Sequence, residues 1–252
     1  MKYIRYLKNN EITYGALVEN SVREIKGDIF NKYKITSLEH NIEKLEVLPP
    51  VTPSKVIAIG LNYLDHAQEM DMPVPKEPLI FLKPATTVIG DKDTIFLPPT
   101  SKKVDYEAEL AIIIGKKAKD ITVKDSSDYI LGYTCANDVT ARDLQEKDGQ
   151  WTRAKSFDTF CPLGPAIVTD INTHSLDIQC ILNDTVVQSS NTRQMIFKAE
   201  ELVSYVSHIM TLYPGDVIIT GTPTGIGQIQ DGDIVEIKID QIGTLQNFVE
   251  KL

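Results

Sequence analysis

The sequence predicts a mixed, β-rich α+β fold, and three observations support this class. Most apolar residues fall in short runs rich in Val, Ile and Tyr that end at Gly, Pro, Asp or Asn, as strands do. Only one stretch, at residues 202–210, has the apolar spacing of a longer amphipathic helix. Strands and helices do not alternate, which argues against a doubly wound nucleotide-binding fold and favours a β-roll or sandwich.

The first 50 residues are expected to form a small N-terminal β domain. Strands are predicted at residues 3–7, 12–18 and 22–25, separated by charged turns. Residues 49–53 (Pro-Pro-Val-Thr-Pro) cannot lie inside a sheet or a helix, because proline lacks the backbone N–H. We therefore place a domain boundary here, with domains at residues 1–50 and 51–252.

The larger domain is predicted to contain further strands and one helix. The strands are expected at residues 55–60, 79–83, 94–97, 109–115, 130–136, 166–169, 176–183, 216–221 and 233–239. The helix presents one apolar stripe, formed by Leu202, Val203, Val206, Ile209 and Met210. Glu200 and Glu201 suit the positive end of the helix dipole, so we expect this helix to pack on a sheet.

Composition excludes several classes of function. Acidic residues outnumber basic ones 35 to 26, so the chain lacks the basic face that nucleic acid requires. The longest apolar run, residues 110–115, is far shorter than the ~20 residues of a membrane span, and residues 1–10 do not resemble a signal peptide. Cys135, Cys161 and Cys180 form no Cys-x-x-Cys pair, which predicts reduced thiols. We expect a soluble, cytoplasmic protein with neither a nucleic-acid nor a membrane partner.

An acidic strand carries the first candidate site. Alternate residues of a strand share a face, so Asp105, Glu107 and Glu109 point the same way, and that face continues into apolar residues. Crowded carboxylates resist desolvation, and a divalent cation such as Mg²⁺ or Mn²⁺ removes that conflict. Asp138, which follows another predicted strand, would complete a three-carboxylate site. The alternative is an acidic edge strand facing water, with Asp138 as a turn residue.

Two further groups of residues could act on a substrate. His66 and Glu69 are spaced i, i+3, so one helical turn would bring them together, and the carboxylate would orient the imidazole as a base for activating water. Arg142 and Gln145 could bind a carboxylate, and Lys155, among apolar and aromatic neighbours, could face an anion. The alternatives are a surface pair in a loop, an exposed helix face and a surface lysine.

The glycine-rich segment at residues 221–227 is not a phosphate-binding loop. No Gly-Lys-Ser/Thr follows it, and a turn comes next instead of a helix. We expect its glycines to let the backbone approach a ligand closely. The sequence also contains no Gly-x-Ser-x-Gly and no His-Glu-x-x-His, so serine-hydrolase and zincin classes have no support.

Five segments, taken in order, resemble the fumarylacetoacetate hydrolase family. They are GLNYLDH at 60–66, YEAEL at 106–110, NDVTARDLQ at 137–145, KSFDTFCPLGP at 155–165 and GDVIITGTPTGIG at 215–227. The likeness covers residues 51–252, and the first 50 residues are similar to the small β domain of many bacterial members. Longer fumarylacetoacetases tend to have an aspartate where Asn62 stands, so the resemblance is to the shorter branch, which puts fumarylacetoacetate itself in doubt as the substrate.

The resemblance implies a family-type β-roll, a Mg²⁺ or Mn²⁺ ion, a homodimer and a mobile lid that carries the His66–Glu69 pair. The implied catalytic residues are His66, Glu69 and Lys155; the implied substrate-binding residues are Arg142, Gln145 and Thr222; the implied metal ligands are Glu107, Glu109 and Asp138.

The implied reaction starts from a small-molecule 2-oxo acid, with the metal stabilising an enolate as a bond at C3 breaks. The outcomes are acylpyruvate hydrolysis, oxaloacetate decarboxylation, or isomerisation of 2-hydroxyhepta-2,4-diene-1,7-dioate. We favour C–C cleavage, chiefly acylpyruvate hydrolysis, because decarboxylation alone does not need the His66–Glu69 pair. The isomerase is the first alternative, and a catalytically silent metal-binding scaffold is an alternative of another class.

Overall fold

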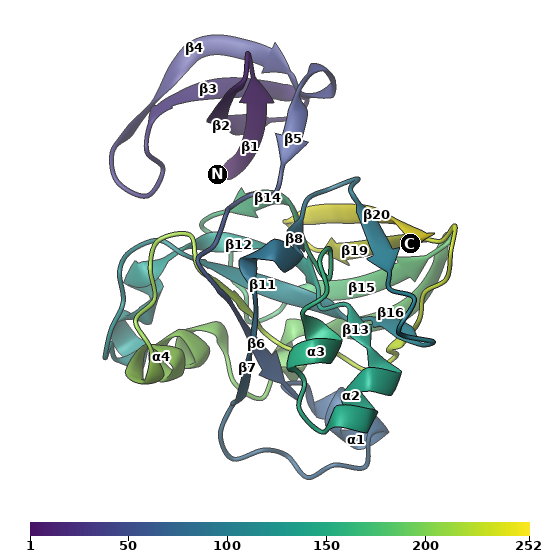
Figure 1. The fold of residues 1–252 in the computed structure, drawn as a ribbon. Helices are drawn as coiled ribbons and strands as arrows, with labels where there is room; N and C mark the ends of the chain where they lie inside the picture. Colours follow the sequence, from purple (N-terminus) through teal and green to yellow (C-terminus); the bar gives the residue numbers. More distant parts are fainter.

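The computed structural model describes all 252 residues, and most of its regular structure is β-strand (Figure 1). The strands are β1 (Lys2–Lys8), β2 (Glu11–Val18), β3 (Ser21–Gly27), β4 (Tyr33–Asn41), β5 (Glu46–Leu48), β6 (Val56–Gly60), β7 (Leu79–Lys83), β8 (Val88–Ile89), β9 (Thr94–Leu97), β10 (Val104–Tyr106), β11 (Ala108–Ile114), β12 (Ile130–Asn137), β13 (Thr140–Ala141), β14 (Cys161–Val168), β15 (Asp177–Leu182), β16 (Thr185–Asn191), β17 (Val217–Ile219), β18 (Gly227–Gln228), β19 (Ile234–Ile239) and β20 (Gly243–Lys251). The β-rich class predicted from the sequence is confirmed.

These strands form three sheets. The largest has 12 strands in the order β4-β3-β2-β1-β14-β12-β11-β17-β6-β7, with β5 beside β1 and β8 beside β14. A second sheet has the order β16-β15-β19-β20-β9, and a third has the order β13-β10-β18.

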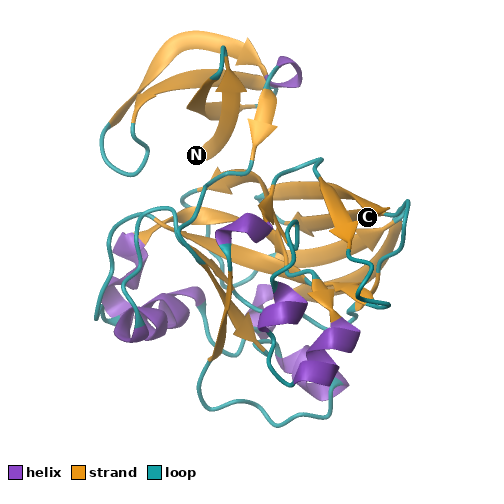
Figure 2. Cartoon of the chain, in the orientation of Figure 1, coloured by secondary structure: helices purple, strands orange, loops and turns teal.

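The helices are short and lie away from the N-terminal strands, apart from one turn (Figure 2). They are α1 (Leu64–Glu69), α2 (Arg142–Asp148), α3 (Thr152–Lys155), α4 (Ala199–Ile209) and four 3₁₀ turns, η1 (Ile42–Lys44), η2 (Ala85–Thr87), η3 (Val123–Tyr129) and η4 (Thr192–Gln194). None of the helices has the length and apolar composition that crossing a membrane would need.

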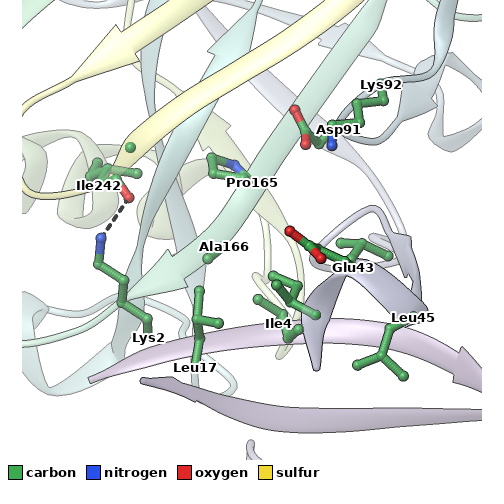
Figure 3. Close-up of a pocket in the computed structure, with 13 residues that line it drawn as sticks. Lys2, Ile4, Leu17, Glu43, Leu45, Asp91, Lys92, Pro165, Ala166 and Ile242 are labelled. Carbon is green, nitrogen blue, oxygen red and sulfur yellow. Dashed lines mark hydrogen bonds between the residues drawn. The ribbon is translucent and has the colours of Figure 1, made fainter. Parts of the chain in front are cut away.

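Strands β1 to β5 stand apart from the rest of the chain in Figure 1 and join it through a short pairing of β1 with β14. The three strands predicted here are present, but β4 and β5 were not predicted, because most β4 side chains are exposed and no buried face alternates along it. A pocket of about 480 Å³ lies at the junction, with Lys2 and Leu17 on one side and Asp91 and Pro165 on the other (Figure 3). Its lining shares no residue with the pocket that holds the candidate site.

All the strands predicted for the larger domain are present; β7 and β9 have the predicted ends, and the others have shifted ends. The largest error concerns β14, predicted at 166–169, which begins at Cys161. Pro162 and Pro165 indicated a break, but Pro165 lies where the pairing with β12 changes register, so the sheet accommodates it. Strands β16 and β20 were not predicted, because polar residues interrupt their apolar pattern.

The predicted helix is α4, but its buried face differs from the predicted stripe. Leu202, Val203 and Val206 are buried, whereas Ile209 is 55% exposed, which contradicts the prediction. Ser207 is buried instead, because its hydroxyl accepts a hydrogen bond from the Ile121 backbone N–H at 3.1 Å. This hydrogen bond holds the Ser207 side of α4 against the segment that comes just before η3.

Strand β11 lies in the middle of the molecule, and every residue in it is buried. Leu110 and Ile112 enter one apolar cluster, while Ala111 and Ile113 enter another on the opposite face. Burial on both faces explains why this strand is continuously apolar. Glu109 on the same strand is therefore carried into the core.

Candidate active site

Three carboxylates meet where β10, β11 and β12 end. Oxygen atoms of Glu107, Glu109 and Asp138 all lie within 4.8 Å of one another, and the three residues are 6%, 1% and 1% exposed. The chain leaves strand geometry at Glu107 itself, so the single strand expected over residues 104–110 is two strands. The water-facing alternative does not describe this cluster. Asp105 lies outside the three-carboxylate group but shares Arg142 with Glu107, because its carboxylate accepts a hydrogen bond from Arg142 Nε at 2.8 Å.

Three buried or half-buried cations balance these carboxylates. Lys155 Nζ donates to Glu107 Oε2 at 2.9 Å and to Asp138 Oδ2 at 2.6 Å. Arg142 forms a salt bridge with Glu107, and Lys83 forms one with Asp138. Lys83 was missed by the sequence analysis, although a lysine at the end of the apolar strand β7 was a signal, because a strand end can carry a side chain into a site.

The carboxylates differ in their electrostatic environment. Burial tends to raise the pKa of Glu107, but Lys155 and Arg142 outweigh it and lower that pKa to about 2. Burial raises the pKa of Glu109 well above its usual value, and Asp138 and Glu107 raise it further. The one hydrogen bond that Glu109 accepts comes from the Gly221 N–H at 2.6 Å.

The charge count and the donor set fit a divalent cation. The buried carboxylates at this site are Asp105, Glu107, Glu109 and Asp138, and the cations that contact them are Lys83, Arg142 and Lys155. If all four carboxylates are ionised, they carry one negative charge more than the three cations, and Glu109, which has no salt-bridge partner, is the one whose ionised form a bound divalent cation would stabilise. Three oxygen-donor side chains this close suit Mg²⁺ or Mn²⁺.

His66 and Glu69 lie on helix α1 and contact each other. His66 Nδ1 and Glu69 Oε2 are 2.8 Å apart, and Glu69 Oε1 accepts a hydrogen bond from the Gly225 N–H at 3.0 Å. Burial works to raise the pKa of Glu69, but the hydrogen bonds from His66 and Gly225 lower it overall. Because Glu69 engages Nδ1, the second ring nitrogen, Nε2, is left to act on a substrate.

The glycine-rich segment donates backbone hydrogen bonds to one carboxylate of the cluster and to the carboxylate beside His66. Gly221 and Gly225 have φ of +91° and +95°, and their N–H groups donate to Glu109 and Glu69. A Cβ at Gly221 would lie 2.8 Å from the Cβ of Asn62, so the glycine permits a close approach within the protein.

The three predicted substrate-binding residues make hydrogen bonds with other side chains of the protein. Arg142 Nη1 donates to Gln145 Oε1 at 2.6 Å, so these two side chains contact each other as well as facing the pocket. The Thr222 hydroxyl accepts from Gln188 Nε2 at 3.0 Å, and Gln188 Oε1 accepts from the Ala108 N–H. Gln188 was missed, because nothing in its strand distinguishes it in the sequence.

Asn62 supports the backbone around the site. Its Nδ2 donates to the carbonyl oxygens of Thr220 and Phe197, and its Oδ1 accepts from the Phe197 N–H. An aspartate at this position could not donate the first two hydrogen bonds.

A pocket of about 310 Å³ joins these groups. Of the predicted site residues, all but Glu69 line it. Its lining residues are Ile59, Gly60, Leu61, His66, Met70, Met72, Leu79, Phe81, Glu107, Glu109, Asp138, Arg142, Gln145, Glu146, Trp151, Lys155 and Thr222.

Comparison with known proteins shows what this chain is similar to. The rat (Rattus norvegicus) mitochondrial protein oxaloacetate tautomerase Fahd2a is 50% identical over 214 residues, which cover 80% of this chain and 68% of the relative. The solved structure of 2-hydroxyhepta-2,4-diene-1,7-dioate isomerase from Mycobacterium marinum is 41% identical, with a TM-score of 0.92 over 100% of this chain and 98% of that one. A fumarylacetoacetate hydrolase from Exiguobacterium antarcticum is 32% identical, with a TM-score of 0.90 over 100% of both chains.

Two family models also match the chain. The Rv2993c-like N-terminal model covers residues 1–50, and the fumarylacetoacetate (FAA) hydrolase C-terminal model covers residues 55–250. Together with the fold and the order of the motifs, this match confirms the resemblance found in the sequence. The chain belongs to the fumarylacetoacetate hydrolase family.

Proposed function

We propose that this chain is an enzyme that transfers a proton at C3 of a small 2-oxo acid and so interconverts its keto and enol forms. The observation that carries the proposal is the His66–Glu69 contact at 2.8 Å, on the same pocket as the carboxylate cluster. A positioned base and an electropositive environment for the enolate are the two requirements of this step. The name of the rat relative, an oxaloacetate tautomerase, makes oxaloacetate the first substrate to test.

The roles of the side chains follow from their contacts. Glu107, Glu109 and Asp138 would hold Mg²⁺ or Mn²⁺, which when bound supplies a Lewis acid that favours negative charge on the 2-oxo oxygen. His66 Nε2 takes the proton from C3, and Glu69 stabilises the imidazolium that results. Burial works against the ammonium of Lys155, but Asp138 and Glu107 outweigh it and raise its pKa, so Lys155 stays charged beside the substrate.

C–C cleavage is the second candidate, and the same contact supports it. If His66 takes its proton from water instead of C3, the hydroxide can add to the 4-oxo group of an acylpyruvate. The C3–C4 bond then breaks, and the acyl group leaves as a carboxylic acid while the pyruvate enolate takes the proton back from His66 to give pyruvate. Oxaloacetate decarboxylation needs no such water. Isomerisation of 2-hydroxyhepta-2,4-diene-1,7-dioate, the reaction in the name of the M. marinum protein, is a third proton transfer of the same kind.

The test is a comparison of substrates on one metal-loaded preparation. Purified protein with Mg²⁺ or Mn²⁺ is assayed for ketonisation of enol-oxaloacetate, hydrolysis of acetylpyruvate and isomerisation of the dienedioate. We expect ketonisation to be fastest, to stop with EDTA and to return with either ion. A silent scaffold would turn over none of the three, and faster hydrolysis than ketonisation would put the second candidate first.

We also propose that the chain works as a cytoplasmic homodimer of two-domain subunits. The edge strand β7 exposes Leu82 at 46%, an apolar surface that a second copy could cover. Mass measurement by light scattering should give twice 28.2 kDa. A monomer at micromolar concentration would contradict the dimer.

A further inference from the structure

The pocket of the candidate site has a charged end and an apolar end. The charged end holds the carboxylate cluster with its cations. The apolar end is formed by five side chains, Met70, Met72, Leu79, Phe81 and Trp151. The two ends meet at Phe81, because Lys155 Nζ lies 5.2 Å from the centre of the Phe81 ring.

The side chains at the apolar end form one wall of the pocket. The rings of Phe81 and Trp151 pack edge to face with their centres 5.1 Å apart. Trp151 and Leu79 both lie against Gly60, where a Cβ would come within 2.7 Å of the Trp151 ring. The absence of a side chain at Gly60 therefore lets the indole approach the end of β6 closely.

The wall continues to the surface. Leu79, Met70 and Met72 are 51%, 49% and 51% exposed, although they line the pocket. A ligand that extended past Phe81 would cover these side chains and remove their apolar area from water.

The apolar end contains no positive charge. The basic residues that line the pocket are Arg142, Lys155 and His66, and each already contacts a carboxylate. The other charge on the lining is the exposed carboxylate of Glu146 on α2. A second carboxylate on a substrate would find no partner here, and Glu146 would repel it.

We infer that the preferred substrate is a monoanionic 2-oxo acid whose chain beyond C3 ends in an apolar group, held against Phe81, Trp151 and Met72. This inference rests on the proposed function for the 2-oxo acid head and adds the chemistry of the tail. The dicarboxylates named for the relatives, oxaloacetate and the dienedioate, are then poorer ligands of this chain than an alkyl or aryl analogue.

The chain supplies its own probe for binding. Trp151 is the only tryptophan in the sequence, so its fluorescence reports ligand entry without any turnover. Two ligands with the same head and length differ only in the tail: 2-oxoglutarate ends in a carboxylate, and 5-methyl-2-oxohexanoate ends in an isopropyl group. With Mg²⁺ present, we expect the isopropyl compound to bind about tenfold or more tightly.

A matched pair of variants tests whether the preference for an apolar tail comes from the side chains of the wall. Met72 and Val74 are 51% and 53% exposed on the same segment, but only Met72 lines the pocket. Met72→Lys should strengthen 2-oxoglutarate binding and weaken binding of the isopropyl compound, whereas Val74→Lys should change neither by more than about twofold.

The possible results distinguish a failure of this inference from a failure of the proposed function. Equal or tighter binding of 2-oxoglutarate by the unaltered protein would overturn the inference and leave the 2-oxo acid head intact. Equal effects of the two lysine variants would overturn it as well. A Met72→Lys protein that lost the mass of a dimer but kept both affinities would also overturn it, because the apolar wall would then be a contact with a second copy of the chain. If neither compound changed the fluorescence and no 2-oxo acid were turned over, the proposed function would fail first.

Discussion

The carboxylate cluster and His66 of the His66–Glu69 pair line one pocket, but the cluster and the pair are built in opposite ways. The cluster lies at the ends of buried strands, and its members are at most 6% exposed. The pair lies on the six-residue helix α1, in which only Ala67 is buried, and its side chains are 12% and 32% exposed. The sheet thus fixes the groups that hold charge, while the groups that move a proton lie on a segment with few apolar contacts.

The largest expected effect comes from breaking the cluster. Asp138→Ala removes the partner of two buried cations, Lys83 and Lys155, as well as a candidate metal ligand. Activity should fall to background in every assay, and the free energy of unfolding should drop by about 3–5 kcal/mol. Urea unfolding and turnover, with the exposed Asp240→Ala as control, test both losses. An active, fully stable Asp138→Ala would contradict the account of the cluster.

Breaking the pair should affect the rate alone. His66→Ala should lower proton transfer and any acylpyruvate hydrolysis by about 10²–10⁴, the usual contribution of a positioned base. Mn²⁺ affinity, measured by calorimetry, should stay unchanged, as should both properties in His174→Ala, an exposed histidine elsewhere. Any oxaloacetate decarboxylation should fall far less. Parallel loss of metal binding would mean that the two regions are not independent.

A pH-dependent stability should distinguish Glu109 from its neighbours. Its pKa is raised by burial, so its ionised form destabilises the metal-free fold as pH rises above the usual carboxyl value of about 4.5. In EDTA, Glu109→Gln should therefore be more stable than the unaltered protein at pH 8 and nearly equal to it at pH 4. Added Mg²⁺ should stabilise only the unaltered protein. The idea fails if the two chains respond alike to pH.

The smallest effect concerns motion. Residues 62–75 hold α1 and an exposed stretch that ends at Pro75, so we expect them to exchange amide hydrogens quickly and to become protected when Mg²⁺ and oxalate bind. Strand β11 should show no change, because it is fully buried already. Equal protection of residues 62–75 with and without oxalate would count against a lid.

Short-range periodicity predicted two parts of the site, whereas the resemblance to the family assigned Asp138 to the metal ligands and gave the pair its catalytic role. Alternation along one strand brought Glu107 and Glu109 together, and i, i+3 spacing brought His66 to Glu69. Arg142 and Lys155 were predicted as site residues, but their salt bridges with the carboxylates and the presence of Lys83 were not, since Lys83 and Lys155 reach Asp138 from positions 55 and 17 residues away. The expected repulsion among the carboxylates was therefore too strong for Glu107, which has two cationic partners. The expectation is correct for Glu109, which has none and whose pKa is raised.

The reaction was the hardest feature to predict. The same His66–Glu69 contact could act on a water proton or a C3 proton. The sequence favoured C–C cleavage, whereas the names of the two more similar relatives reported, a tautomerase and an isomerase, favour proton transfer. The fold was limited in a similar way: Ile209 has the right periodicity for burial, yet the hydroxyl of Ser207 takes the buried place. Polar contacts between distant segments leave no pattern in a single sequence.

Deuterium exchange at C3 tests the central claim most directly. A 2-oxo acid that cannot be cleaved, 2-oxobutyrate, is incubated in D₂O with the Mg²⁺-loaded protein, and loss of the C3 proton signal is followed by NMR beside oxaloacetate. We expect exchange well above the metal-only rate, lowered about 10²–10⁴-fold in His66→Ala and unchanged in His174→Ala. Hydrolysis of acetylpyruvate without any acceleration of C3 exchange in either acid would show that His66 acts on water, and would contradict proton transfer at C3 as the function of this site.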